Sequence, residues 1–191
     1  MKSMNELFYD VELLNELSGN IRAALRVSDP DGPSGRSGGS IGVCQHDTRH
    51  GKYGKTILRE CGFTPAEIEQ VVNMSGDMKA LAAKLKPEIV EKYDTIQLSE
   101  CLNSALNATT GNGVMAVTTG PILALADYVN QYGSIGPSFV EYLNKKDTDG
   151  LTIEEIQEWK LNHTKYGREH PTDCRRRYAN ILKVLKDNEC T

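Results

Sequence analysis

The sequence has few aromatic residues, no long hydrophobic run and no excess of positive charge. Only 6% of its 191 residues are Phe, Trp or Tyr, and the formal net charge is −4. A negative balance gives no general attraction to nucleic acid, because that binding depends on neutralising phosphates with Lys and Arg. No segment approaches the roughly 20 consecutive apolar residues that a transmembrane helix needs. We therefore expect a globular protein that neither spans a membrane nor binds nucleic acid.

The first twenty residues also lack the pattern of a secretory signal peptide. Such a signal has a basic start and an apolar core, whereas this segment carries four acidic side chains: Glu6, Asp10, Glu12 and Glu16. The five cysteines are widely spaced and contain no C-x-x-C pair, which does not favour a zinc site. We expect synthesis in the cytoplasm without a signal peptide, and buried free thiols.

Apolar residues at helical spacing predict a mostly α protein with one small β element. Helices are expected over residues 5–17, 21–27, 81–85, 89–93, 96–106, 119–132, 139–143, 152–162 and 174–185, with a further helix starting at a Thr64 cap. The basic run at 175–177 is interpreted as a solvated helix face. Residues 41–44 are the one expected strand, half of a small hairpin. The predicted fold class is mostly α with a small β-hairpin (α+β), in a single domain over residues 1–191.

Residues 28–50 hold most of the polar chemistry of the chain. A loop rich in Gly, Ser and Pro runs into the expected strand, which is followed by Gln45, His46, Asp47 and Thr48. Cleavage of a glycosidic bond needs one carboxylic acid and a second group, usually a carboxylate, about 5–10 Å away. Asp29 and Asp47 are the candidate pair, and the loop and hairpin are expected to line a cleft.

This segment resembles the lysozyme-like superfamily, in particular phage-type lysozymes and lytic transglycosylases. In phage-type lysozymes the first core helix ends in Leu-Arg-Ile-Asp-Glu-Gly, whose Glu is the general acid, and a Thr-Ile-Gly-x-Gly-His hairpin follows. Residues 25–29 (Leu-Arg-Val-Ser-Asp) and 40–45 (Ser-Ile-Gly-Val-Cys-Gln) are similar to these runs. Residues 39–45 are also similar to the Gly-x-x-Gly-Leu-Met-Gln segment that follows the catalytic Glu of lytic transglycosylases. The resemblance covers roughly residues 21–50 and carries Asp29 where the family has Glu.

The resemblance implies a peptidoglycan-degrading glycoside hydrolase of the muramidase or lysozyme type. Asp29 is the expected acid, with Asp47 and Ser40 positioning water or stabilising charge. The expected substrate-binding residues are Asp31, which is also the fallback acid, Gln45, His46 and His50. The glycan strand is the expected partner, together with a delivery system or an inhibitor protein. The protein would act on the cell wall or periplasm after release or delivery, as a phage endolysin or an antibacterial toxin does.

Simpler interpretations remain open for each of these groups. Residues 29–32 are typical of a local turn, Asp47 and Thr48 of a cap on the next helix, and the two histidines of an exposed polar loop. The Asp at the acid position also favours a non-catalytic module that binds glycan or a partner protein.

Two further sites compete with the glycosidase hypothesis. Cys44 and His46 are a candidate nucleophile pair for an amidase or peptidase. Asp147 and Asp149 are candidates for a partial calcium site, although their register excludes a complete EF-hand. The alternative there is a turn followed by a Thr152/Glu155 capping box. No other metal or cofactor is expected.

Overall fold

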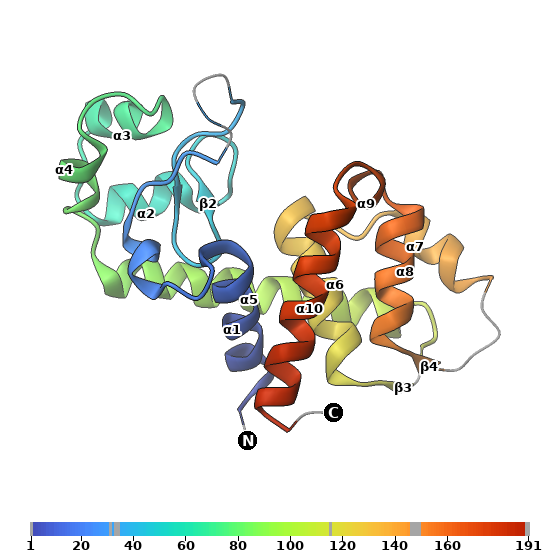
Figure 1. Ribbon diagram of the computed structural model, residues 1–191. Helices are drawn as coiled ribbons and strands as arrows, with labels where there is room; N and C mark the ends of the chain where they lie inside the picture. The colour runs from blue at the N-terminus through green and yellow to red at the C-terminus, as the bar shows by residue number, and fades with distance from the viewer. Residues whose placement is uncertain (1, 31, 33–34, 115, 146–149, 190–191) are drawn as a thin grey trace. The chain divides into compact units, whose positions relative to one another are not determined.

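The protein is described by a computed structural model that covers residues 2–30, 32, 35–114, 116–145 and 150–189. It is mostly helical with a small antiparallel two-stranded sheet, which confirms the coarse fold class, and it has a second, parallel two-stranded sheet where the sequence indicated only one β element (Figure 1). Contacts within the chain define two compact units, Glu16–Gln97 and Met1–Asn15 with Leu98–Thr191. A single domain over residues 1–191 stays a prediction. No helix in the described ranges is long and apolar enough to cross a membrane.

The unit Glu16–Gln97 holds the hairpin and a set of short helices. Its elements are the end of α1 (Met4–Leu17), the 3-10 helix η1 (Ile21–Leu25), β1 (Ser40–Ile41), β2 (His46–Asp47), α2 (Gly54–Glu60), α3 (Pro65–Val72), α4 (Met78–Ala82) and the first part of α5 (Pro87–Thr110). The capping box predicted at Thr64 is confirmed, since Thr64 and Glu67 satisfy each other's backbone N–H groups at the start of α3.

The second unit contains the rest of α5 and the remaining elements. These are β3 (Ala116–Val117), α6 (Thr119–Tyr132), α7 (Pro137–Leu143), β4 (Gly150–Leu151), α8 (Ile153–His163), α9 (Lys165–Glu169) and α10 (Pro171–Asp187). The helix predicted over residues 119–132 is confirmed as α6, which is buried from Gly120 to Val129. The Thr152/Glu155 capping box is confirmed at the start of α8. Asp147 and Asp149, the candidate calcium ligands, lie outside the described residues.

The sequence-based interpretations of α5 and of the basic run in α10 were wrong. The segments expected as separate helices at 89–93 and 96–106 belong to the single 24-residue helix α5. Thr95 does not interrupt α5, because its hydroxyl donates to the Glu91 carbonyl at 2.9 Å and so satisfies itself within the helix. The basic run at 175–177 is not wholly a solvated face, since Arg177 is buried and forms an ion pair with Asp127 at 2.6 Å.

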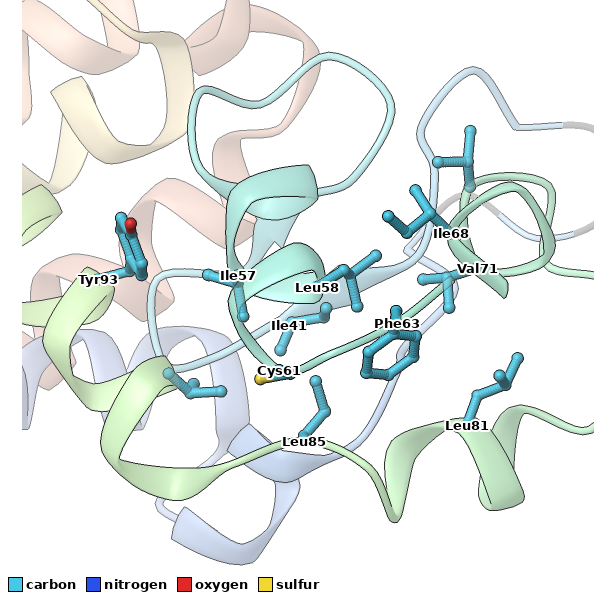
Figure 2. Packing of buried hydrophobic residues seen from close by; sticks show 12 residues of the cluster. Ile41, Ile57, Leu58, Cys61, Phe63, Ile68, Val71, Leu81, Leu85 and Tyr93 are labelled. Atoms are coloured by element: carbon cyan, nitrogen blue, oxygen red, sulfur yellow. The ribbon is translucent and has the colours of Figure 1, made fainter. Parts of the chain in front are cut away.

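The hairpin is anchored on an apolar cluster inside its own unit. Ile41 of β1 is buried together with Ile57 and Leu58 of α2 and with Cys61, which directly follows that helix (Figure 2). Residues from α3, α4 and α5 complete the cluster: Ile68, Val71, Val72, Leu81 and Val90, among others. Burying side chains of this size contributes about 1.5–3 kcal/mol each. The cluster therefore stabilises β1 far more than the pairing of its two residues with β2 does.

The buried thiols expected from the sequence are confirmed for four cysteines. The side chains of Cys44, Cys61, Cys101 and Cys174 are all free and buried. Burial raises the pKa of the Cys101 thiol to about 12. The fifth, Cys190, lies outside the described residues.

Candidate active site on the hairpin

The hairpin is shorter than the sequence suggested, and its turn carries the unusual backbone. Ser40 pairs with Asp47 and Ile41 with His46 in an antiparallel register. Residues 42–45 form the turn, so the strand expected over 41–44 ends at Ile41. Gly42 and Gln45 both have positive φ, +83° and +51°. This conformation is unremarkable for Gly42 and uncommon for a residue with a Cβ, so surrounding contacts must hold Gln45 there.

Asp94 of α5 fixes the residues on either side of Gln45. Its carboxylate accepts the backbone N–H of Val43 at 3.0 Å and that of Cys44 at 2.9 Å. It also lies 3.1 Å from Nε2 of His46. Because an ionised carboxylate only accepts hydrogen bonds, this geometry assigns the His46 proton to Nε2. Charge-assisted hydrogen bonds of this kind are about twice as strong as neutral ones.

His46 helps to hold the turn and does not lie in an exposed loop. Its side chain is fully buried against Asp94, so the interpretation of His46 as an exposed polar residue was wrong. The ring meets Tyr53 edge to face at 6.0 Å. Since a glycan cannot reach a fully buried ring, we correct its expected substrate-binding role to one of supporting the turn.

Gln45 is oriented from two sides. Ser28 Oγ donates to Gln45 Oε1 at 2.7 Å, and Gln45 Nε2 donates to the Gly42 carbonyl at 2.9 Å. Ser28 is itself fixed to β1 by two backbone hydrogen bonds with Ser40, at 3.0 and 2.9 Å. The Gln45 side chain is half-buried. Within the described part of the chain, these contacts leave its amide one N–H and one oxygen lone pair.

Asp47 is the carboxylate at the open end of the hairpin. Its Oδ1 accepts the backbone N–H groups of Gly38 and Arg49, both at 2.8 Å. It therefore ties the Gly-rich loop to β2 and does not cap the next helix. Helix α2 begins at Gly54 with no side-chain cap, so the capping interpretation of Asp47 and Thr48 was wrong.

The other predicted site residues fall into different environments. Ser40 is buried in β1, which places its hydroxyl away from solvent. His50 is exposed, with Nε2 3.1 Å from the Arg36 carbonyl. Asp29 is exposed, and its Oδ1 accepts the Gly32 N–H at 2.9 Å, which is the local turn that the sequence left open. Asp31 lies outside the described residues.

Cys44, His46 and Asp94 could together hold a metal ion by ligand type. One ligand atom from each lies within 4.8 Å of the others, and all three side chains are buried. Thiolate, imidazole and carboxylate is a combination that zinc accepts. However, Asp94 already accepts three hydrogen bonds, so a cation would have to displace the His46 contact.

The same burial weighs against Cys44 as a nucleophile. Its Sγ donates to the Asp94 carbonyl at 3.7 Å and lies inside the protein. Reactive cysteines are partly exposed and stand in electropositive surroundings. Cys44 and His46 are close together, as the amidase hypothesis required, but a substrate cannot reach them.

A groove of about 610 Å³ in the same unit is lined by other residues. Its lining consists of Leu25, Arg26, Val27, Met78, Lys79, Ala82, Ala83 and Leu85. None of these is a carboxylate or a predicted site residue, so the groove does not supply the acid and base of a glycosidase.

Two residues that matter here were missed in the sequence. Asp94 lies four residues after the buried Val90, so a charged residue on the apolar face of a helix was the available signal. Glu16 is in the last turn of α1 and is the first residue of the unit that contains the hairpin. The signal for Glu16 was its place at the end of the first helical pattern, just before Ser18 and Gly19 break it.

Comparisons with known proteins add no relative. No family model, curated protein or solved structure matches the chain.

Proposed function

We propose that this protein is a lysozyme-like glycosidase that cleaves the glycan strands of peptidoglycan. The observation that carries the proposal is the hairpin turn, whose hydrogen bonds hold the Gln45 amide and the Asp47 carboxylate, two residues apart in sequence, on a fixed backbone. Fixed hydrogen-bonding groups beside a carboxylate are what a sugar-cleaving site requires. The similarity of residues 39–45 to the lytic transglycosylase segment supports the same assignment.

The proposed general acid is Glu16 and not Asp29. In the resembling families the acid is a Glu at the end of the first helix, and the first helix of this chain ends at Leu17. The segment expected as a second helix is only the five-residue 3-10 helix η1, so Asp29 does not follow a core helix. Asp29 is also already engaged in its own exposed turn.

In this mechanism two carboxyl groups divide the chemistry. Glu16 in its protonated form donates to the glycosidic oxygen as the bond to the sugar carbon breaks. Asp47 uses Oδ2 to stabilise the positive charge that develops on the sugar or to activate the attacking water. Gln45 uses its remaining N–H and lone pair to bind the N-acetyl group of the substrate, which offers one C=O and one N–H in return. The enzyme acts on the cell wall after release or delivery, in the manner of an endolysin or an antibacterial toxin.

The test compares cell-wall clearing by the intact protein with that of isosteric variants. Glu16→Gln and Asp47→Asn each remove one carboxylate, whereas Asp29→Asn and the exposed Glu69→Gln serve as controls. We expect the first two variants to lose at least about 100-fold in rate, the scale of acid–base catalysis, and the controls to retain it. Released fragments are assayed for new sugar ends and for free amino groups.

Each alternative has its own result in this experiment. Loss of activity in Asp29→Asn with full activity in Glu16→Gln would return the acid to Asp29. Clearing with new amino groups and no new sugar ends would indicate an amidase. Binding to cell walls without clearing would indicate the non-catalytic glycan-binding module.

A further inference from the structure

Asp94 is buried, lies about 50 residues from the hairpin in sequence, and directs its carboxylate entirely at that hairpin. Its three hydrogen-bond partners there are the backbone of Val43, the backbone of Cys44 and the ring of His46. These partners stand on both sides of Gln45. The acceptor therefore fixes the chain immediately before and immediately after the residue that has the uncommon φ of +51°.

The glycine at the start of the turn shows how closely the carboxylate approaches. A Cβ added at Gly42 would lie 2.6 Å from Asp94 Oδ1 and 3.1 Å from Oδ2. Gly42 also receives the Gln45 side chain on its carbonyl, and its N–H donates to the Ala24 carbonyl at 3.0 Å. The carboxylate, the glycine and the glutamine amide thus form one connected arrangement.

From this arrangement we propose that Asp94 is the positioning residue of the site: it holds the 42–45 turn in the conformation that orients the Gln45 amide toward the N-acetyl group of a glycan. The ligand part of this inference rests on the proposed function. Asp94 does not touch the substrate, because its carboxylate is buried beneath the turn. Its effect on ligand binding is transmitted by its hydrogen bonds to the backbone of Val43 and Cys44 and to the ring of His46.

The positioning itself is tested without any ligand, by NMR of the ¹⁵N-labelled protein. Asp94→Asn keeps the size of the side chain but removes the charge, and Glu91→Gln is the matched control on the exposed side of α5. In Asp94→Asn we expect the backbone amides of Val43 and Cys44 and the side-chain amide of Gln45 to shift, with the remaining spectrum retained. In Glu91→Gln these signals stay in place. A folded Asp94→Asn protein with unshifted Gln45 signals would overturn the proposal.

A milder pair of variants decides the question if Asp94→Asn does not fold. His46→Gln keeps an N–H donor for Asp94, whereas His46→Leu removes it. We expect the Gln45 amide signals to be retained in His46→Gln and to shift in His46→Leu. The same signals in both variants would contradict the proposed route through His46.

The effect of this positioning on ligand binding is measured by calorimetry with a tetramer of N-acetylglucosamine. We expect Asp94→Asn to weaken binding about tenfold in the intact protein and to have little further effect in a Gln45→Ala background, since residues that act as one unit are not additive. Equal effects in both backgrounds would refute an action through Gln45. If the intact protein does not bind the tetramer, the proposed function fails, and the NMR comparison still decides the role of Asp94.

Discussion

Replacing Asp127 by Asn should destabilise the protein strongly, because Asp127 neutralises two buried cations. Asp127 is fully buried in α6. Its Oδ2 accepts Lys160 Nζ at 2.8 Å, and its Oδ1 accepts Arg177 Nη1 at 2.6 Å and Asn15 Nδ2 at 2.8 Å. Lys160 is only 2% exposed. Removing one partner of a buried pair leaves a buried charge uncompensated, which costs about 3–5 kcal/mol.

That loss is large compared with the total stability of a typical domain, about 5–15 kcal/mol. It is measured by urea unfolding at pH 7, followed by circular dichroism. The control is Asp187→Asn, which breaks the exposed i,i+4 pair with Lys183 and should cost under about 1 kcal/mol. A loss for Asp127→Asn as small as that of the control would refute the reasoning.

The same ion group predicts a pH dependence. Burial by itself would raise the pKa of Asp127, but Lys160 and Arg177 outweigh it and hold this pKa below its usual range. A lowered pKa in the folded state adds stability that is present above the unfolded value, near 4, and is lost as the pH falls toward the folded value. The difference in unfolding free energy between the intact protein and Asp127→Asn should therefore shrink in strong acid. An unchanged difference down to pH 2 would contradict this assignment.

Two further substitutions test local features of the unit that contains the hairpin. Gly42→Ala should destabilise the protein more than Gly62→Ala does. Both positions have positive φ, but only at Gly42 would an added Cβ collide with Asp94. The two urea midpoints measure the difference. Lys84→Met should raise the pKa of Glu67 from about 2 toward its ordinary range, because the Lys84 hydrogen bond is the main cause of the lowered value; an NMR titration of the Glu67 carboxyl that still gives a value near 2 would exclude Lys84 as that cause.

Local sequence signals predicted the parts of the fold that depend on local chemistry. The capping boxes at Thr64 and Thr152 are complete within four residues, and the structure has both. The buried helix α6 was predictable because most of its residues are apolar. The single helix α5 was not, because Thr95 interrupts the apolar pattern without interrupting the backbone hydrogen bonds.

The candidate site was predictable in composition but not in arrangement. The sequence placed Gln45 and Asp47 at the hairpin, and both are only half-buried there. It could not show that the His46 side chain is buried, because its hydrogen-bond acceptor, Asp94, lies 48 residues further along the chain. A pairing of that separation leaves no local pattern in either segment, and only a charged residue on the buried side of α5 hinted at it.

The dependence of the hairpin on Asp94 also sets an order of events during synthesis. The turn around residues 42–45 leaves the ribosome about 50 residues before the carboxylate that completes it. A two-residue strand pair has little stability of its own, so the nascent hairpin has no lasting structure until α5 begins to form and pack. The turn is therefore expected to form together with the core of the unit Glu16–Gln97, once α5 has been synthesised, and not as an independent hairpin.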